Sequence, residues 1–221
     1  MSHAGGVPDR IHIVGARTES IMDAILFFLE QHARLHAADV PDGASVADRI
    51  LGGLTDDQMR LRPAKGTNSL AWLLWHMART EDVSVNRVVT DGRQVFDESW
   101  ARRLGVSRLD IGTGMTDEEV AELTTRIDVA AARAYRRAVG RRTREVVQAV
   151  APAAWAETVG AGDVARAQRD GAIGPRAGWL LDFWQNHSRA ARLGTVGLMH
   201  NALHLGEAQT LRSVLGLGGG R

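Results

Sequence analysis

Apolar side chains recur at intervals of three and four residues along four long stretches of the sequence. An α-helix completes a turn every 3.6 residues, so this interval predicts helices that each bury one face. No stretch shows the sustained two-residue alternation of a half-buried strand. The predicted long helices cover residues 18–39, 68–90, a segment that begins at Thr116, and residues 177–215. Amphipathic helices joined through long crossover loops predict an all-α four-helix bundle.

Capping residues help to place the ends of these helices. Thr116 and Glu119 have the spacing of a capping box, and Asn68 is of a type favoured at the N-cap. The fourth helix is expected to bend near Gly194 or Gly197. A short helix is predicted at residues 45–54, and irregular loops at 91–115 and 151–176. The resulting domain organisation is an N-terminal extension at residues 1–17, one bundle at 18–216 and a flexible tail at 217–221.

Composition narrows the classes of function. The 27 basic and 26 acidic side chains nearly balance, which argues against the clustered positive charge of a nucleic-acid-binding surface. The sequence has no cysteine, so any sulfur chemistry requires a thiol from a small molecule. The longest apolar run, residues 24–29, is far too short to span a bilayer. We therefore expect a cytoplasmic protein that acts on a small molecule and does not bind membranes.

Two pairs of histidines are spaced four residues apart, which places each pair on one face of a helix. His32 and His36 lie near the end of their predicted helix, where a cationic imidazole is favourable, so no ligand role is needed to explain them. His200 and His204 lie in mid-helix, on a face expected to point into the bundle. Buried imidazoles need partners for their ring nitrogens, and a metal ion is one such partner.

The second long helix supplies a third candidate ligand, His76. Facing helices of a bundle are a usual place for a metal site, and three histidines leave at least one coordination position free. The neighbouring Glu81 and Asp82 are expected to point away from the face of His76 and to be structural or exposed. Four tryptophans are interpreted mainly as core or pocket-wall residues: Trp72, Trp75, Trp179 and Trp184.

Two segments resemble the DinB/YfiT-like superfamily of metalloenzymes. They are N-S-L-A-W-L-L-W-H-M-A-R-T-E-D at residues 68–82 and H-N-A-L-H-L-G-E-A-Q-T-L-R-S-V-L-G at 200–216. The resemblance implies a bundle in up-down-down-up order, often dimeric, with a metal held by His76, His200 and His204. Relatives in that superfamily include mycothiol- and bacillithiol-dependent S-transferases and a mycothiol-dependent maleylpyruvate isomerase.

The leading hypothesis is a metal-dependent enzyme that activates a mycothiol-like thiol, or water, for S-transfer, isomerisation or hydrolysis. Zinc is the first expectation for the metal, and nickel or iron also suits nitrogen ligands. Glu207, one turn beyond His204, is the candidate catalytic residue, as a general base, an orienting group or a further ligand. The arginine-rich face of the third helix is interpreted as solvated.

Two alternatives remain open at this point. One is a stress-associated helical bundle that binds a metal or small ligand without turnover. The other is a bundle without metal, in which the histidines form hydrogen bonds to Glu207 and to one another.

Overall fold

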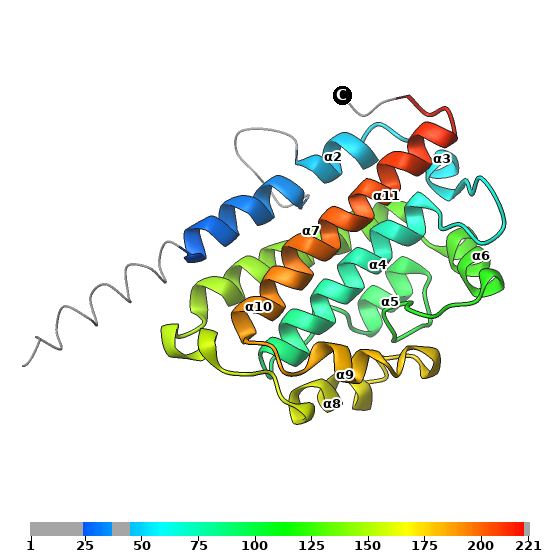
Figure 1. Cartoon of the computed structure of the whole chain (residues 1–221). Helices are drawn as coiled ribbons and strands as arrows, with labels where there is room; N and C mark the ends of the chain where they lie inside the picture. Colours follow the sequence, from blue (N-terminus) through cyan, green and yellow to red (C-terminus); the bar gives the residue numbers. More distant parts are fainter. Residues whose placement is uncertain (1–23, 37–44, 219–221) are drawn as a thin grey trace, which may run out of the picture.

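The computed structural model describes residues 24–36 and 45–218, and these residues form an all-α protein (Figure 1). Within these ranges the extended pairing is limited to an isolated bridge between Thr158 and Ser188. After the N-terminal helix (residues 24–35) come the α-helices α2 Val46–Leu51, α3 Asp56–Arg60, α4 Leu70–Val83, α5 Glu98–Leu104, α6 Asp117–Arg126, α7 Val129–Ala149, α8 Ala161–Arg169, α9 Leu180–Trp184, α10 Arg189–Leu193 and α11 Asn201–Val214. Two π-helices, η1 Ser84–Val89 and η4 Gly194–His200, and two short 3₁₀ turns, η2 Pro152–Ala156 and η3 Pro175–Ala177, complete the described elements.

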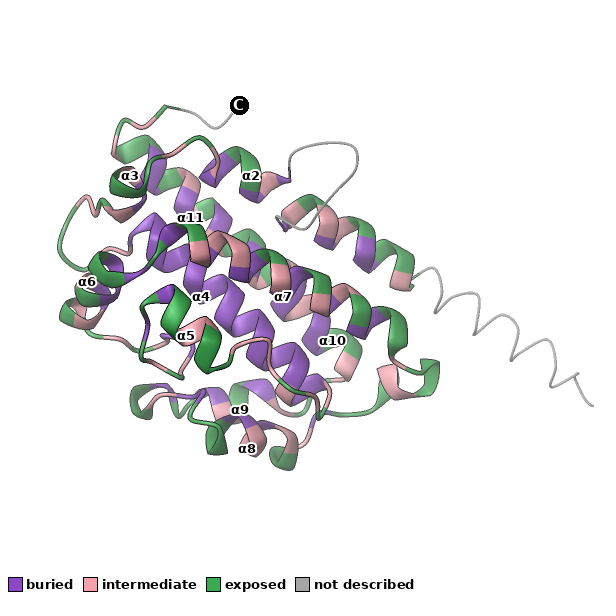
Figure 2. Ribbon diagram, turned by 180° about the vertical axis from the view of Figure 1, so that it is seen from behind, coloured by how far each residue is buried: buried purple, intermediate pink, exposed green. Residues whose placement is uncertain are grey.

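Four long helical segments lie side by side, and the shorter α8 and α9 cover one end (Figure 1). The four are the N-terminal helix, α4 with η1, α7, and the continuous run of α10, η4 and α11. The helix α4 lies at the centre of this arrangement, and all 14 of its residues are buried. Figure 2 shows it as a buried helix surrounded by the others. The predicted up-down-down-up order remains a prediction.

The main hydrophobic core surrounds α4. Trp75 and Met77 from α4 are completely buried, as is Tyr135 from α7, and Leu205 of α11 is 1% exposed. Complete burial of a large apolar side chain contributes about 1.5–3 kcal/mol, so α4 is fixed by packing on all sides. This rigid central helix is the one that carries His76.

The first two long helices agree with their predicted positions where the structure describes them. The predicted helix at 18–39 is helical over residues 24–35 and is followed by a bend at His36. Residues 18–23 and 37–39, with the extension at 1–17, lie outside the described residues. The second helix begins after Ser69, whose side chain accepts a hydrogen bond from the amide of Trp72. The prediction of Asn68 as the N-cap was therefore wrong by one residue, and Asn68 is free for another role.

The third predicted helix is interrupted. Ile127 adopts an extended conformation that ends α6, and Asp128 then caps the start of α7 through the amide of Ala131. The guanidinium of Arg60 donates to the Ile127 carbonyl at 2.8 Å, which supplies a partner that the broken helix does not. Two predicted loops also contain helices, α5 in 91–115 and α8 in 151–176.

The fourth long helix begins at Arg189, not at residue 177. Residues 177–184 hold the end of η3 and the short helix α9. The chain then turns at Asn186, which adopts a positive φ of 65°, and Ser188 caps a new helix. The bend expected near Gly194 or Gly197 stays a prediction, and both glycines lie in the π-helix η4. At Gly197 a Cβ atom would lie 2.8 Å from the ring of Phe28, so glycine permits close contact with the N-terminal helix.

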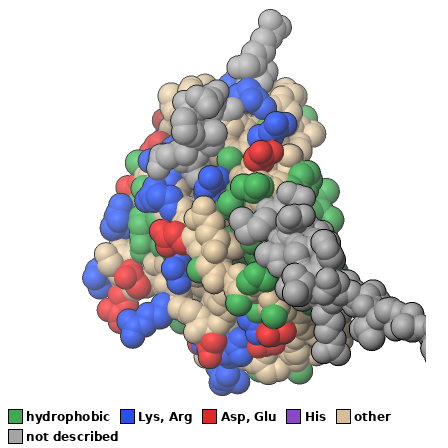
Figure 3. Space-filling view, turned by 90° about the vertical axis from the view of Figure 1, so that its left-hand side faces the viewer, with side chains coloured by type: hydrophobic (Ala, Val, Ile, Leu, Met, Phe, Trp, Pro, Cys, Tyr) green, Lys and Arg blue, Asp and Glu red, His purple; other side chains and the backbone are tan. Residues whose placement is uncertain are grey.

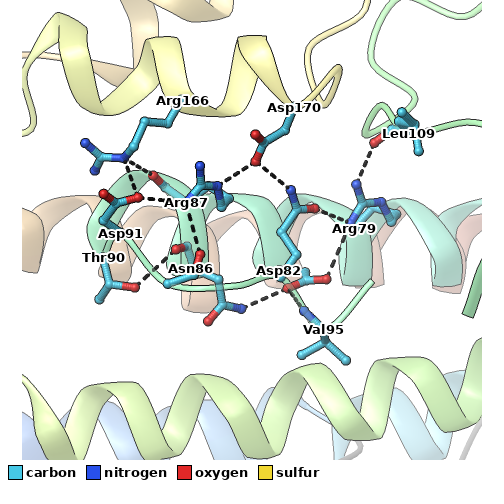
Figure 4. A network of polar contacts seen from close by, with 12 residues as sticks. Arg79, Asp82, Asn86, Arg87, Thr90, Asp91, Val95, Leu109, Arg166 and Asp170 are labelled. Carbon is cyan, nitrogen blue, oxygen red and sulfur yellow. Dashed lines mark hydrogen bonds and ion pairs between the residues drawn. The ribbon is translucent and has the colours of Figure 1, made fainter. Parts of the chain in front are cut away.

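A buried polar network ties the segment after η1 to α4 (Figure 4). Asp82 accepts hydrogen bonds from the amides of Val95 and Phe96, both at 2.8 Å. One turn earlier, Arg79 donates to the carbonyl oxygen of Leu109 at 2.6 Å. Asp82 is therefore structural, as predicted, but it is completely buried. The network thus fixes the segment from Val95 to Leu109 against the helix that carries His76.

The surface in Figure 3 shows basic and acidic side chains interspersed on one face. In the described part of the chain, no helix is both long and apolar enough to cross a membrane.

Candidate metal centre and its cavity

The structure brings His76, His200 and His204 together. Each offers a ring nitrogen, and these three atoms all lie within 4.8 Å of one another. His76 comes from the middle of α4, His200 ends η4, and His204 lies one turn into α11. Three predicted ligand residues, far apart in sequence, thus form one cluster of a size that a metal ion could occupy.

Hydrogen bonds orient two of these rings. The Nδ1 atom of His76 lies 2.5 Å from the carbonyl oxygen of Ile111. A carbonyl can only accept, so Nδ1 carries the proton and Nε2 is left with its lone pair. His204 makes the equivalent contact, with its Nδ1 atom 2.9 Å from Oε2 of Glu207. Such partners commonly fix the tautomer and direction of metal-binding histidines.

Glu207 is itself held in place. Its Oε1 atom accepts a hydrogen bond from Nδ2 of Asn68 at 2.8 Å, across from the start of α4. The hydrogen bond from His204 lowers the pKa of Glu207, so the carboxylate is ionised at neutral pH. Three roles were predicted for Glu207, and its contact with His204 matches the one in which it orients a ligand residue.

Burial keeps the imidazoles of His76 and His200 neutral. Desolvation lowers the pKa of His76 to about 4, with a further lowering from nearby His204. Desolvation likewise lowers the pKa of His200 well below its ordinary value. Neutral imidazole is the form that donates a lone pair to a metal. The buried Nδ1 atom of His200 has no hydrogen-bond partner among the described residues, and a bound metal would give this ring one. The residues present therefore fit a divalent metal.

The π-helix contributes to this alignment. In an α-helix, residues four apart drift by about 40° around the axis at each step. The wider turn of the π-helix η4 rotates by a smaller angle per residue, which offsets this drift. Arg192, Val196, His200 and His204, each four residues after the last, all line the same cavity.

The cavity has a volume of about 420 Å³. Trp72 forms one wall, with its ring stacked on that of His76 at a centroid distance of 4.6 Å. Trp179 and Trp184 also line it, so these three tryptophans are pocket-wall residues, whereas Trp75 belongs to the core. The histidine cluster thus faces a space that a small organic molecule could fill.

A second cluster contains His32, His36 and Glu81. The ring of His32 lies 2.9 Å from Oε1 of Glu81, His36 lies 3.5 Å from Oε2, and all three residues are completely buried. The two histidines lie near the end of their helix, as predicted, but the interpretation that this position alone explains them was wrong. Their partner is a carboxylate on a different helix, which only the packed fold brings near.

This second cluster fits a structural role better than a metal site. Glu81 already accepts hydrogen bonds from Thr143 at 2.6 Å and from Asn201 at 2.8 Å. The fully buried Arg136 adds positive charge beside it, which lowers the pKa of both Glu81 and His36 and opposes a second cation. The prediction that the arginine face of the third helix is solvated was thus wrong for Arg136, whereas Arg126 is exposed as predicted.

Sequence reasoning missed two features of the site. The carbonyl of Ile111 carries no side-chain signature, so no residue pattern points to it. Arg192 does have a signal, because it precedes His200 by eight residues in the same four-residue series.

Comparison with known proteins places the chain in a family. A family model described as the DinB superfamily matches residues 43–208. The fold is similar to the crystal structure of a conserved protein from Enterococcus faecalis, with a TM-score of 0.56 and 17% identity over 90% of this chain and 97% of that one. No curated protein matches. Because the family model spans more than half of the 221 residues, the chain belongs to the DinB superfamily.

Proposed function

We propose that this protein is a metal-dependent enzyme that acts on a small molecule bound in the cavity beside His76, His200 and His204. The observation that carries the proposal is the position of the three-histidine cluster in the wall of a 420 Å³ cavity. Three protein ligands with room for a further one are typical of catalytic metal sites, whereas structural sites fill their coordination shell with protein.

When bound, a divalent metal at neutral ligands would lower the pKa of a bound thiol or water and so supply a nucleophile at neutral pH. The protein's own residues prepare that site. Ile111 and Glu207 each hold one imidazole by its Nδ1–H, so its other nitrogen faces the cluster. The apolar ring of Trp72 covers one side of His76 and limits the access of bulk water.

The absence of cysteine determines where a reactive sulfur would come from. We propose a low-molecular-weight thiol such as mycothiol as cosubstrate, for S-transfer or isomerisation. Hydrolysis by activated water is the version that needs no thiol. Zinc is the proposed metal, ahead of nickel and iron, and a homodimer in the up-down-down-up arrangement is proposed for the assembly.

Elemental analysis tests the proposal. Protein purified without an affinity tag or added metal is compared with the His76→Ala and His200→Ala variants, and the exposed His187→Ala serves as the control. We expect near-stoichiometric metal in the wild type and the control, and loss from both site variants. A wild type that stays free of metal after incubation with zinc, nickel and iron(II) would refute the site.

Turnover is tested separately on metal-loaded protein. Mycothiol is supplied with a panel of electrophiles, and ester substrates are supplied without thiol. Activity that disappears in His200→Ala and persists in His187→Ala supports an enzyme. Stoichiometric metal without turnover of any substrate would favour the alternative of a metal- or ligand-binding bundle.

A further inference from the structure

We infer that Arg192 forms an anion-binding subsite in the cavity, so that the ligand of this protein is an elongated molecule with an apolar body and a carboxylate or phosphate at the end remote from the histidines. The inference rests on the proposed function, because it takes the cavity as the substrate site.

Arg192 is buried without the partners that a buried cation normally has. Its side chain is 3% exposed, and among the described residues no carboxylate forms an ion pair with it. Within the described chain its side chain makes one hydrogen bond, from Nε to Oγ of Ser84 at 2.8 Å. Burial lowers its pKa to about 9, so the guanidinium is still charged at pH 7. A buried charge is costly unless it is paired, and a bound anion would provide the pair.

Arg79 and Arg212, two other buried arginines of the described chain, use terminal nitrogens within the protein. The terminal nitrogens of a third, Arg136, have no hydrogen-bond partner in the described chain, but its charge acts on the nearby carboxylate of Glu81. Those of Arg79 donate to Tyr135, Gln94 and Leu109, and one of Arg212 donates to backbone carbonyls. The two terminal nitrogens of Arg192 make no such bond in the described chain. The difference suggests that Arg192 is kept for a ligand.

The guanidinium is also oriented in advance. Its carbon lies 4.5 Å from the centre of the Trp184 ring, and Ser84 holds Nε. With those contacts in place, the two terminal nitrogens remain as a planar fork, which matches the two oxygens of a carboxylate or phosphate. Preorganisation of this kind lowers the entropy that binding costs.

The described walls of the cavity supply no opposing charge. None of the described residues that line it is acidic, and the lining is otherwise rich in apolar and aromatic side chains such as Trp72, Leu180 and Val196. Positive charge at Arg192, in the wall of a largely apolar space, favours an amphipathic anion over a neutral or cationic molecule.

The spacing along the helix gives the length of the ligand. Arg192 precedes His200 by eight residues, which corresponds to roughly 10–12 Å along the axis. The reacting group would lie at the histidines and the anion at Arg192, about two turns away. An extended chain of about six to eight atoms between the reacting group and the anion would span this distance.

Calorimetric titration tests the subsite directly. The probes are hexanoate, hexyl phosphate and the neutral isostere hexanamide, and the proteins are wild type and Arg192→Met, in which the apolar stem still packs on Trp184. Arg102→Gln, a surface arginine, is the control. We expect Arg192→Met to bind hexanoate and hexyl phosphate about tenfold to a hundredfold more weakly, with hexanamide unchanged. The tighter of the two anions identifies the headgroup.

The same titrations in the His76→Ala background separate this inference from the proposed function. Hexanoate that binds there and depends on Arg192 supports the subsite even where metal analysis has refuted the metal site. Equal hexanoate affinity in wild type and Arg192→Met would overturn the subsite, whether or not metal binds. If circular dichroism shows that Arg192→Met does not fold, Arg192→Lys decides: we expect severalfold weaker hexanoate binding with unchanged hexanamide, and unchanged hexanoate would overturn it.

Discussion

The Nδ1 atom of His76 lies 2.5 Å from the carbonyl oxygen of Ile111, in a segment 35 residues further along the chain. The carbonyl points at the ring because its segment is fixed on both sides. Arg79 holds Leu109 just before it, and the amide of Gly112 donates to Asp110 at 2.8 Å just after it. A backbone group in an otherwise irregular connection thus orients the central histidine.

Gly112 should be essential to that arrangement. Its φ is +85°, and a Cβ atom would lie 2.5 Å from Cζ3 of Trp75. We expect Gly112→Ala to destabilise the protein by about 1–3 kcal/mol, since the backbone is strained and Trp75 must move. Displacement of the Ile111 carbonyl should also weaken zinc affinity by about tenfold or more. Denaturant unfolding and zinc titration against a competing chelator measure the two effects.

Gly53→Ala is the matched control for this variant. Gly53 has a similar φ of +68°, but its Cβ atom would have nothing within 4 Å. It should therefore show backbone strain alone and keep wild-type zinc affinity. Equal losses of zinc affinity in the two variants would show that the effect does not pass through Ile111.

Glu207 connects His204 to Asn68 and offers a second test. In Glu207→Gln the amide oxygen can still accept from His204, but the negative charge is lost. We expect about a tenfold loss of zinc affinity, typical of a partner that holds a metal-binding histidine. Glu122→Gln, on an exposed face, should leave zinc affinity unchanged. Unchanged zinc affinity with lost turnover in Glu207→Gln would instead favour the predicted role as general base.

Local patterns predicted a large part of this molecule. The spacing of apolar residues at three and four positions predicted the central helix α4. The four-residue spacing of His200 and His204 identified the pair of histidines that faces His76. These features depend on residues close together in sequence, where helix geometry alone decides which side chains share a face.

The remaining features depend on contacts between distant segments. The interruption at Ile127 is stabilised by Arg60, and the burial of His32 and His36 depends on Glu81 from another helix. Arg136 has the sequence context of a solvated arginine and is nevertheless completely buried. None of these could be predicted from periodicity, because each depends on which helix faces become neighbours.

Asp82 should be among the most important polar residues for stability. Besides the amides of Val95 and Phe96, it accepts hydrogen bonds from Asn86 at 2.8 Å and from Tyr135 at 2.5 Å. We expect Asp82→Asn to cost about 3–5 kcal/mol, because it leaves the buried Arg79 without its carboxylate. The exposed Glu98→Gln is the control.

Hydrogen exchange locates the effect of Asp82→Asn. The amides of Val95 and Phe96 should lose protection in this variant, because the amide group that replaces the carboxylate accepts fewer bonds. Unchanged protection at both positions together with near-wild-type stability would show that Asp82 does not hold this segment.

Acid should destabilise the fold through the cluster of His32, His36 and Glu81. Burial and the nearby Arg136 lower the pKa of His36 well below its ordinary value, with smaller effects from His32 and Arg144 and an opposing one from Glu81. The unfolded chain therefore binds a proton at this position at a higher pH than the folded protein does. Stability from a neutral His36 is complete above about pH 6.5 and is lost as the pH falls, by at most about 1.4 kcal/mol per pH unit.

Glu81 should add to this loss at lower pH. Burial alone would raise its pKa, but His36, His32 and Arg136 together hold it well below the usual range. Its contribution is therefore complete above about pH 4.5 and is lost below that value.

The free energy of unfolding of the metal-free protein, measured between pH 7 and 5, tests the contribution of His36. Wild type and His36→Gln share the histidines of the cavity, so the difference between their slopes measures the contribution of His36. We expect a shallower loss of stability in His36→Gln, while the exposed His187→Gln keeps the wild-type slope. Parallel slopes in wild type and His36→Gln would mean that His36 binds protons alike in the folded and unfolded states, and that the buried cluster is not the acid-sensitive element of this fold.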